Sequence, residues 1–383
     1  MNININKTSN ENTNKTALIL PGGGARGSYQ VGVVKAISEI LEPNNNHFPI
    51  ICGTSAGAIN AAVLASHADE FAYGVSQLEK FWGGLQCSDI YRTDTWNILK
   101  TMLRLVASVM LGGFGVKAPK SLLDNAPLKQ LLQRALRLEG IERSILGGSL
   151  QAVSLTASAY TTSDAISFYQ GMANLKNWQR SRRQGVAQKL EVEHIMASAA
   201  LPFLFPAQRL GTQYFGDGGL RMVAPLGPAI HLGASKILII GTRDRHFIPE
   251  PETLVEYPSL GELGGYMLDT IFMDNLEADL SRLRRINHTL SLMTDEQCKQ
   301  AKLRKIETFV IRPSVDIREI TKEHANAIPR SVRFLLKSIG GWGSDWRMPS
   351  YLLFESDYTR ALMDLGYRDA HSQAEEIRAF FNQ

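Results

Sequence analysis

Residues 48–65 read FPIICGTSAGAINAAVLA, and they decide the kind of fold that the chain adopts. Phe48 to Cys52 form a short apolar run, typical of a buried strand, and Ala58 to Ala65 are small and apolar, as in a packed helix. Between them, Gly53-Thr54-Ser55-Ala56-Gly57 matches the Gly-x-Ser-x-Gly pattern of a sharp strand-to-helix turn. Such a turn projects the serine hydroxyl outward beside a helix N-terminus. Ser55 is therefore a candidate nucleophile, and the alternative is an ordinary serine in a glycine-flanked turn.

The preceding residues repeat this order of elements. Ala17 to Leu20 are apolar and end at Pro21, which predicts a buried strand, and the chain from Val31 to Leu41 has apolar residues at helical spacing. Strand, turn and helix thus occur twice within about sixty residues. This order predicts an α/β fold with a mainly parallel central sheet flanked by helices.

Further strands and helices extend the same pattern. Leu150 to Ala157 and Ala165 to Tyr169 are predicted as paired strands, Lys236 to Gly241 as a central strand and Glu307 to Arg312 as the last one. Helical patterns dominate from Tyr351 onward. No repeat or linker divides the chain. We therefore expect a flexible polar tail over residues 1–16 and a single domain over residues 17–383.

Composition limits the kinds of partner. A hydrophobic content of 44% and a charged content of 20% are those of a globular protein, and a net charge of +4 is too small for a nucleic-acid-binding protein. The three cysteines lack metal-ligand spacing, so neither a disulfide framework nor a zinc site is expected. Nucleophilic chemistry at Ser55 needs no other metal and no cofactor, so none is expected. The first sixteen residues lack the apolar core of a secretory signal. The apolar stretch 105–116 is shorter than the roughly 20 residues that cross a bilayer. We expect a cytoplasmic protein, soluble or attached to a membrane from one side.

A glycine-rich loop precedes the serine turn. Gly22, Gly23 and Gly24 expose backbone N–H groups with no side chain in the way, so the loop can bind an anion or the oxyanion of an acyl-transfer intermediate. The same stretch satisfies Gly-x-Gly-x-x-Gly through Gly22, Gly24 and Gly27, which also allows a dinucleotide site. That alternative is weaker, because the second strand runs directly into Ser55 rather than ending at an acidic residue.

Two kinds of base could serve Ser55. A histidine-based triad would need an acid and then a histidine after the serine, and Asp244 with His288 could be placed in that order. However, the fold that uses this order normally builds several strands before its nucleophile, whereas here only two precede it. Asp217 lies between glycines after the short stretch Gln213 to Phe215, where a turn could hold a carboxylate at the end of the sheet. A plain Asp-Gly turn is the alternative for this residue.

Together, the motifs GGGARG, GTSAG and DGG, in this order, resemble the patatin-like phospholipase family. The segment Ala197 to Pro202 (ASAALP) is similar to the usual lead-in to the family's aspartate, and the resemblance covers residues 17–242 most strongly. It implies a three-layer patatin-like fold and a catalytic dyad in which Ser55 attacks an ester while Asp217 accepts its proton. It also implies an oxyanion hole from Gly22, Gly23 and Gly24 with Arg26. For Arg26, a structural ion pair is an equal alternative.

Residues 96–118 form a possible lid or membrane-contact insertion. Apolar residues recur there at helical spacing, with Lys100 and Arg104 between them, and an ordinary helix packed on the core is the alternative. A basic stretch further on could meet anionic head groups, or simply be a solvated helix face. Its residues are Arg282, Arg284, Arg285, Lys299, Lys302, Arg304 and Lys305.

The function predicted from the sequence is therefore a lipid acyl hydrolase, a phospholipase or lysophospholipase with an acyl-enzyme intermediate. Its partners would be an acyl lipid and a membrane surface, not a nucleic acid. An acyltransferase or thioesterase using the same dyad is an alternative enzyme. A nucleotide-binding protein using the glycine loop, and a catalytically silent lipid-binding module, are alternatives of other classes.

Overall fold

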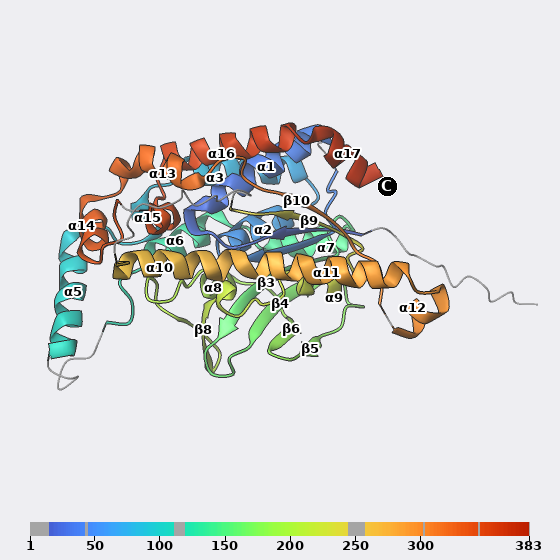
Figure 1. Ribbon diagram of the computed structural model, residues 1–383, viewed down its shortest axis with the longest axis horizontal. Coiled ribbons are helices and arrows are strands. Elements are labelled where there is room, and N and C mark those ends of the chain that lie inside the picture. The colour runs from blue at the N-terminus through green and yellow to red at the C-terminus, as the bar shows by residue number, and fades with distance from the viewer. Residues whose placement is uncertain are drawn as a thin grey trace, which may run out of the picture.

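The computed structural model describes residues 15–42, 45–110, 119–243, 257–301, 303–343 and 345–382. Most of the predicted tail lies outside these ranges, and Thr16, its last residue, already belongs to the first strand. A ten-stranded sheet forms the centre of the molecule (Figure 1), in the order β10-β9-β1-β2-β3-β4-β6-β5, with β8 pairing with β3 and β7. The strands are β1 (Thr16–Leu20), β2 (Ile50–Thr54), β3 (Ala152–Ala159), β4 (Ala165–Gly171), β5 (Trp178–Arg180), β6 (Arg183–Ala187), β7 (Gln208–Leu210), β8 (Gln213–Asp217), β9 (Lys236–Ile240) and β10 (Glu307–Ile311).

Strand direction confirms the predicted α/β class. The consecutive neighbours β10, β9, β1, β2 and β3 all run parallel, as do β4 and β6. The pairs β3–β4, β3–β8, β5–β6 and β7–β8 are antiparallel. Strand β9 lies between β1 and β10, as its apolar sequence predicted. Two parallel strands whose carboxyl ends lie side by side, β1 and β2, lead into the glycine loop and into Ser55.

Helices cover the sheet. They are α1 (Gly27–Ile40), α2 (Ala56–Ser66), α3 (Phe71–Gly83), α4 (Cys87–Ile90), α5 (Thr95–Met110), α6 (Ala126–Ala135), α7 (Glu139–Leu146), α8 (Val192–Ser198), α9 (Gly227–His231), α10 (Leu260–Asp269), α11 (Asn275–Ser291), α12 (Asp295–Ala301), α13 (Ile317–His324), α14 (Arg330–Ser338), α15 (Arg347–Leu352), α16 (Ser356–His371) and α17 (Ala374–Asn382). Among the described residues, no helix is both long and apolar enough to cross a membrane.

The sheet has a separate hydrophobic core on each face. Along β1, Leu18 and Leu20 pack into one core with α1, α2, α3 and α16, while Ala17 and Ile19 pack into the other with α9 and α11. This alternation follows from the two-residue period of a strand. Because both faces are covered, the central strands β1, β3 and β9 are buried along their whole length. The fold is therefore a helix–sheet–helix sandwich with three layers.

One long helical element was not predicted from the sequence. Helices α10 and α11 follow one another through a π-helical segment, η3 (Thr270–Asp274), and the joined element crosses the front of the molecule in Figure 1. Single π-helical turns within α-helices are rare and occur frequently at functional sites. This segment lies over the end of the sheet that carries Ser55.

Candidate active site

Ser55 occupies a strained turn between β2 and α2. Its backbone has φ 56° and ψ −126°, a conformation that is costly for any residue with a Cβ. Close packing of the chain leaves no room for side chains on either side of it. A Cβ added at Gly57 would lie 2.0 Å from the Leu20 carbonyl oxygen, and one at Gly53 would lie 2.3 Å from the Gly57 carbonyl oxygen. The two glycines are therefore needed sterically, which confirms the predicted strand-to-helix turn.

A buried serine on a neighbouring helix holds this turn. The Ser55 N–H donates to Ser198 Oγ over 2.9 Å, and the Ser198 hydroxyl donates to the Thr156 carbonyl oxygen over 2.6 Å. Ser198 is the last residue of α8 and is fully buried. Sequence reasoning did not single out this role. The signal in the sequence is the ASAALP segment, which marks Ser198 through the family resemblance and not through a contact.

Strand pairing brings Asp217 next to Ser55. In the sheet, Thr54 pairs with Thr156 on β3, and the next residue of β3, Ala157, pairs with Asp217 at the end of β8. The serine and the aspartate, distant in sequence, are thus both placed by β3. The Asp217 N–H donates to the Ala200 carbonyl oxygen over 2.8 Å, and the Gly219 N–H donates to Asp217 Oδ1 over 2.9 Å. This turn is more than a plain Asp-Gly turn, because the carboxyl is completely buried.

Burial changes the acidity of Asp217 strongly. Loss of solvent raises the pKa of its carboxyl from 3.8 to about 7, against the smaller lowering effects of the Ser55 hydroxyl and the Gly219 N–H. Among the described residues, Asp217 Oδ2 has no hydrogen-bond partner of regular geometry. The Ser55 hydroxyl faces this carboxyl and lowers its pKa, but it does not complete a regular hydrogen bond to Oδ2. A carboxyl with a pKa near 7 can accept a proton at neutral pH far better than an ordinary aspartate.

The glycine loop approaches Ser55 closely. A Cβ added at Gly22 would lie 2.9 Å from the Ser55 Cβ, so no side chain separates this loop from the serine. Thr242 donates its hydroxyl to the Gly22 carbonyl oxygen over 3.2 Å, which helps to fix the loop. Gly24 has φ +55°, a left-handed conformation that glycine adopts without strain. The loop and Ser55 therefore meet, as predicted.

Arg26 forms a buried hub beside the loop. It is 3% exposed, and its guanidinium lies 4.1 Å from the centre of the Tyr351 ring. Nε donates to Ser350 Oγ over 2.9 Å, and Nη1 donates to Asp269 Oδ1 over 3.3 Å. Nη2 has no partner among the described residues. These contacts are those of the structural ion pair that was the alternative for this residue.

The histidine-based triad has no support at this site. Asp244 lies outside the described residues, and His288 is exposed on α11. Within the described ranges, none of the hydrogen bonds made by Ser55 or Asp217 involves a histidine.

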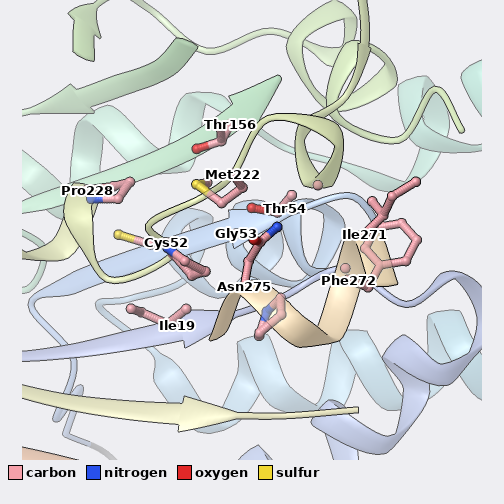
Figure 2. Close-up of a pocket in the computed structure, with 14 residues that line it drawn as sticks. Ile19, Cys52, Gly53, Thr54, Thr156, Met222, Pro228, Ile271, Phe272 and Asn275 are labelled. Carbon is pink, nitrogen blue, oxygen red and sulfur yellow. The ribbon is translucent and has the colours of Figure 1, made fainter. Parts of the chain in front are cut away.

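The site is closed in this structure. Ser55 is 2% exposed, and the cavity beside it holds only about 30 Å³, the space of a water molecule or two. Figure 2 shows Cys52, Gly53 and Thr54 of β2 among the lining residues of this cavity, with Ile271 and Phe272 together to the right of them and Asn275 near Gly53. Phe272 lies directly against the glycines: a Cβ at Gly22 would lie 2.4 Å from its ring, and one at Gly219 would lie 2.9 Å from it.

A serine on a strained turn beside a buried carboxyl and bare backbone amides, carried by a three-layer α/β sheet, defines a class of proteins suited to acyl transfer. The family model for patatin-like phospholipases matches residues 18–230. The chain therefore belongs to the patatin-like phospholipase family.

Individual relatives are phospholipases by name. A cGAMP-activated phospholipase of Pseudomonas aeruginosa is 30% identical over 211 residues, which are 54% of this chain and 53% of that protein. Lysophospholipase nte1 of Aspergillus terreus is 54% identical over 52 residues, 14% of this chain and 3% of that protein. The chain thus spans about half of the first relative and a small part of the second. VipD of Legionella pneumophila aligns over 92% of this chain and 67% of its own, with a TM-score of 0.31 at 13% identity.

Proposed function

We propose that this protein hydrolyses carboxylic esters of phospholipids or lysophospholipids, with Ser55 as nucleophile and Asp217 as general base. One observation carries the proposal: a fully buried carboxyl with a pKa of about 7 faces the hydroxyl of a serine held in a strained turn. The family and the names of its relatives support lipid esters as the substrate class.

The proposed reaction has two halves. Ser55 Oγ attacks the ester carbonyl carbon while its proton passes to Asp217 Oδ2, and the tetrahedral intermediate then expels the alcohol, which takes the proton from Asp217. Water attacks the resulting acyl-serine and gives a proton to Asp217, and collapse of the second intermediate releases the fatty acid as Ser55 regains a proton. The aspartate alternates between base and acid, and its pKa near 7 suits both tasks at neutral pH.

The oxyanion would be stabilised by the glycine loop. In this proposal, the N–H groups of Gly22, Gly23 and Gly24 donate to the negatively charged oxygen of each intermediate. Arg26 fixes the loop through its contacts with Asp269 and Ser350. Direct contact of Arg26 with the oxyanion would have to use Nη2, the guanidinium nitrogen without a partner among the described residues. No cofactor enters the proposed reaction.

A serine-directed fluorophosphonate tests the nucleophile. We expect the probe to label Ser55, as shown by peptide mapping, and Ser55→Ala to abolish both labelling and hydrolysis of a chromogenic acyl ester. Ser154→Ala removes a comparably buried serine from β3 and should leave both intact, so it is the matched control. Labelling at another residue, with full hydrolysis by Ser55→Ala, would overturn the assignment.

Acyl transfer to a second alcohol, or cleavage of a thioester, would use the same two residues. Product analysis with and without an added acyl acceptor separates these reactions. Free fatty acid as the main product in both conditions supports the hydrolase, and acylated acceptor as the main product supports the transferase.

A further inference from the structure

Helix α10 exposes a row of apolar side chains that no described part of the chain covers. Leu260, Leu263 and Met267 recur at spacings of three and four residues, and their side chains are 77%, 41% and 54% exposed. Tyr266, on the same helix, is 59% exposed, and Tyr257, just before the helix, is 91% exposed. An amphipathic helix normally turns this face toward the core. Here the apolar side faces solvent, which indicates a surface for a partner.

Two neighbouring helices extend this surface. On α5, Trp96, Leu103 and Met110 are 73%, 60% and 81% exposed, and on α14, Phe334 is 60% exposed. Figure 1 shows α5, α14 and the start of α10 at the same end of the molecule. We call the exposed apolar residues of α5, α10 and α14 the apolar end; they are Trp96, Leu99, Leu103, Met110, Leu260, Leu263, Tyr266, Met267 and Phe334.

Hydrogen bonds join the three helices into one unit. The Ser331 hydroxyl, at the start of α14, donates to the carbonyl oxygen of Thr93, just before α5. At the other end of α14, the Gly261 N–H donates to the Ile339 carbonyl oxygen over 2.6 Å, and the Ser259 hydroxyl donates to the Gly340 carbonyl oxygen over 2.8 Å. The ends of the three helices are therefore held next to one another.

The charges around the apolar end are mainly positive. Lys100 and Arg104 are exposed on α5, and Arg330 and Lys337 are exposed on α14. Among the described residues, three acidic groups of this region have local partners: Asp94 accepts from the Asn97 N–H, Glu262 accepts from the Ser259 N–H, and Asp345 pairs with Arg347. Exposed Trp, Phe, Leu and Met side chains among lysines and arginines match an anionic bilayer, which accepts apolar groups and attracts cations.

The apolar end is continuous with the element that closes the active site. Helix α10 ends at Asp269, which accepts from the Tyr351 hydroxyl over 2.7 Å and from Arg26. The π-helical segment follows at once, and its Phe272 packs on Gly22 and Gly219 beside Ser55. A phospholipid ester cannot enter a cavity of about 30 Å³. Ser55 is itself 2% exposed, so groups that cover it must move before an ester can reach it, and Phe272 is one side chain packed against its glycine loop.

We propose that the apolar end docks on an anionic lipid bilayer, and that docking withdraws the π-helical segment with Phe272 from the glycine loop and so opens Ser55 to an ester. The proposal rests on the proposed function for the role of Ser55, but the docking surface does not. A π-helical turn holds one residue more than the α-helical path needs, so it can slide by one residue toward regular α-helix. Asp269, at the junction of α10 and this segment, pairs with Arg26 and Arg347, so a shift of α10 that carries the segment with it must also break these two ion pairs.

Docking is tested by sedimentation of the full chain with vesicles of phosphatidylcholine mixed with phosphatidylglycerol, and with vesicles of pure phosphatidylcholine. We expect binding to the mixed vesicles, weakened at least about tenfold by Leu260→Glu with Met267→Glu. The matched control is Leu146→Glu with Leu292→Glu, two leucines that are 82% and 75% exposed outside the apolar end. Charge reversal at Arg330 and Lys337 should also weaken binding about tenfold or more, unlike reversal at the exposed Arg284 and Arg285 on α11. If each double variant of the apolar end binds the mixed vesicles as tightly as its matched control, the docking surface is wrong.

Opening is tested by the rate at which a fluorophosphonate labels Ser55. Mixed vesicles should raise this rate in the wild-type protein at least severalfold, but not in Leu260→Glu with Met267→Glu. Phe272→Ala, or Phe272→Leu if the first variant unfolds, should label faster than wild type without vesicles. Labelling rates that neither vesicles nor a Phe272 substitution change would overturn the proposed opening of the π-helical segment.

The same labelling experiment separates the two proposals. If Ser55 is never labelled although vesicle binding depends on the apolar end, the proposed function fails and the docking surface stands. Labelling of Ser55 together with wild-type binding of vesicles by Ser55→Ala would support both the proposed function and the docking surface, because docking needs no catalysis.

Discussion

The end of the sheet that carries Ser55 and the apolar end differ in almost every physical respect. At the first, Ser55, Asp217 and Ser198 are buried, and their backbone groups are held by neighbouring strands and helices. At the second, large apolar side chains face solvent on three helices. The difference teaches that chemistry and access are built separately here. The sheet fixes the proposed reactive groups, and the helices at the apolar end present the surface proposed for the bilayer.

The largest expected effect concerns the reactive pair. Ser55→Ala and Asp217→Asn should each lower the rate of ester hydrolysis by at least about 10³-fold, and the double variant should be scarcely slower, because the two residues act as a unit. Steady-state hydrolysis of a chromogenic ester measures this. Asp279→Asn, which alters another buried carboxyl whose pKa burial raises, is the control. Losses that multiply in the double variant would mean that the two residues act independently.

The second effect concerns the pH dependence of stability. Asp217 keeps its proton in the folded state up to about pH 7, while the unfolded chain loses it near 3.8. The folded state therefore binds more protons between these values, and the free energy of unfolding falls as the pH rises through this window, by about 4 kcal/mol in the limit. Asp217→Asn should remove that fall. Denaturant unfolding of both proteins from pH 4 to pH 8 measures it, with the exposed Asp357→Asn as control.

A related prediction concerns the pH dependence of activity. In the proposed mechanism the Asp217 carboxyl must be ionised to accept the Ser55 proton, so kcat/KM should rise about tenfold per pH unit below pH 7 and level off above it. A profile that is flat from pH 5 to pH 8, with the protein folded throughout, would show that Asp217 is not the base.

The third effect concerns the packing of the serine turn. Gly57→Ala places a methyl group 2.0 Å from the Leu20 carbonyl oxygen, so we expect a loss of about 3 kcal/mol in the free energy of unfolding. Gly227→Ala, also in a helix, meets its nearest atom only at 3.6 Å and should be nearly neutral. Thermal and denaturant unfolding compare the two, and equal stability would show that the turn is looser than its contacts indicate.

The smallest effect concerns Ser198. Ser198→Ala leaves the buried Ser55 N–H and the Thr156 carbonyl oxygen without this partner, which should cost about 1–2 kcal/mol in stability. If Ser198 positions the turn, kcat should also fall while KM changes little. Ser158→Ala, which removes a buried hydroxyl that donates to the Gly218 carbonyl oxygen, is the control. A loss of stability with unchanged kcat would assign Ser198 a purely structural role.

Much of the fold was predictable because local sequence patterns dictate it. The apolar runs of β1, β2, β9 and β10 and the glycine punctuation between them are visible in the chain, and these strands lie as predicted. The short strands β5, β6 and β7 were missed, because their residues are half-exposed and show no apolar alternation. The helix predicted within 96–118 is present as α5, while residues 111–118 lie outside the described ranges.

The sequence by itself placed Ser55 in a strand-to-helix turn, because the Gly-x-Ser-x-Gly pattern stands between an apolar run and a helix of small residues. It also marked Gly22, Gly23, Gly24 and Asp217, through turn-forming residues beside apolar runs. Only the tertiary structure decided that Asp217 is fully buried and faces Ser55, that Arg26 is tied to Asp269, and that Phe272 closes the site. The physical reason is the sequence separation of the residues that interact. Turns and strands depend on neighbours in the chain, whereas burial, pKa and closure depend on groups that only the packed sheet and helices bring together.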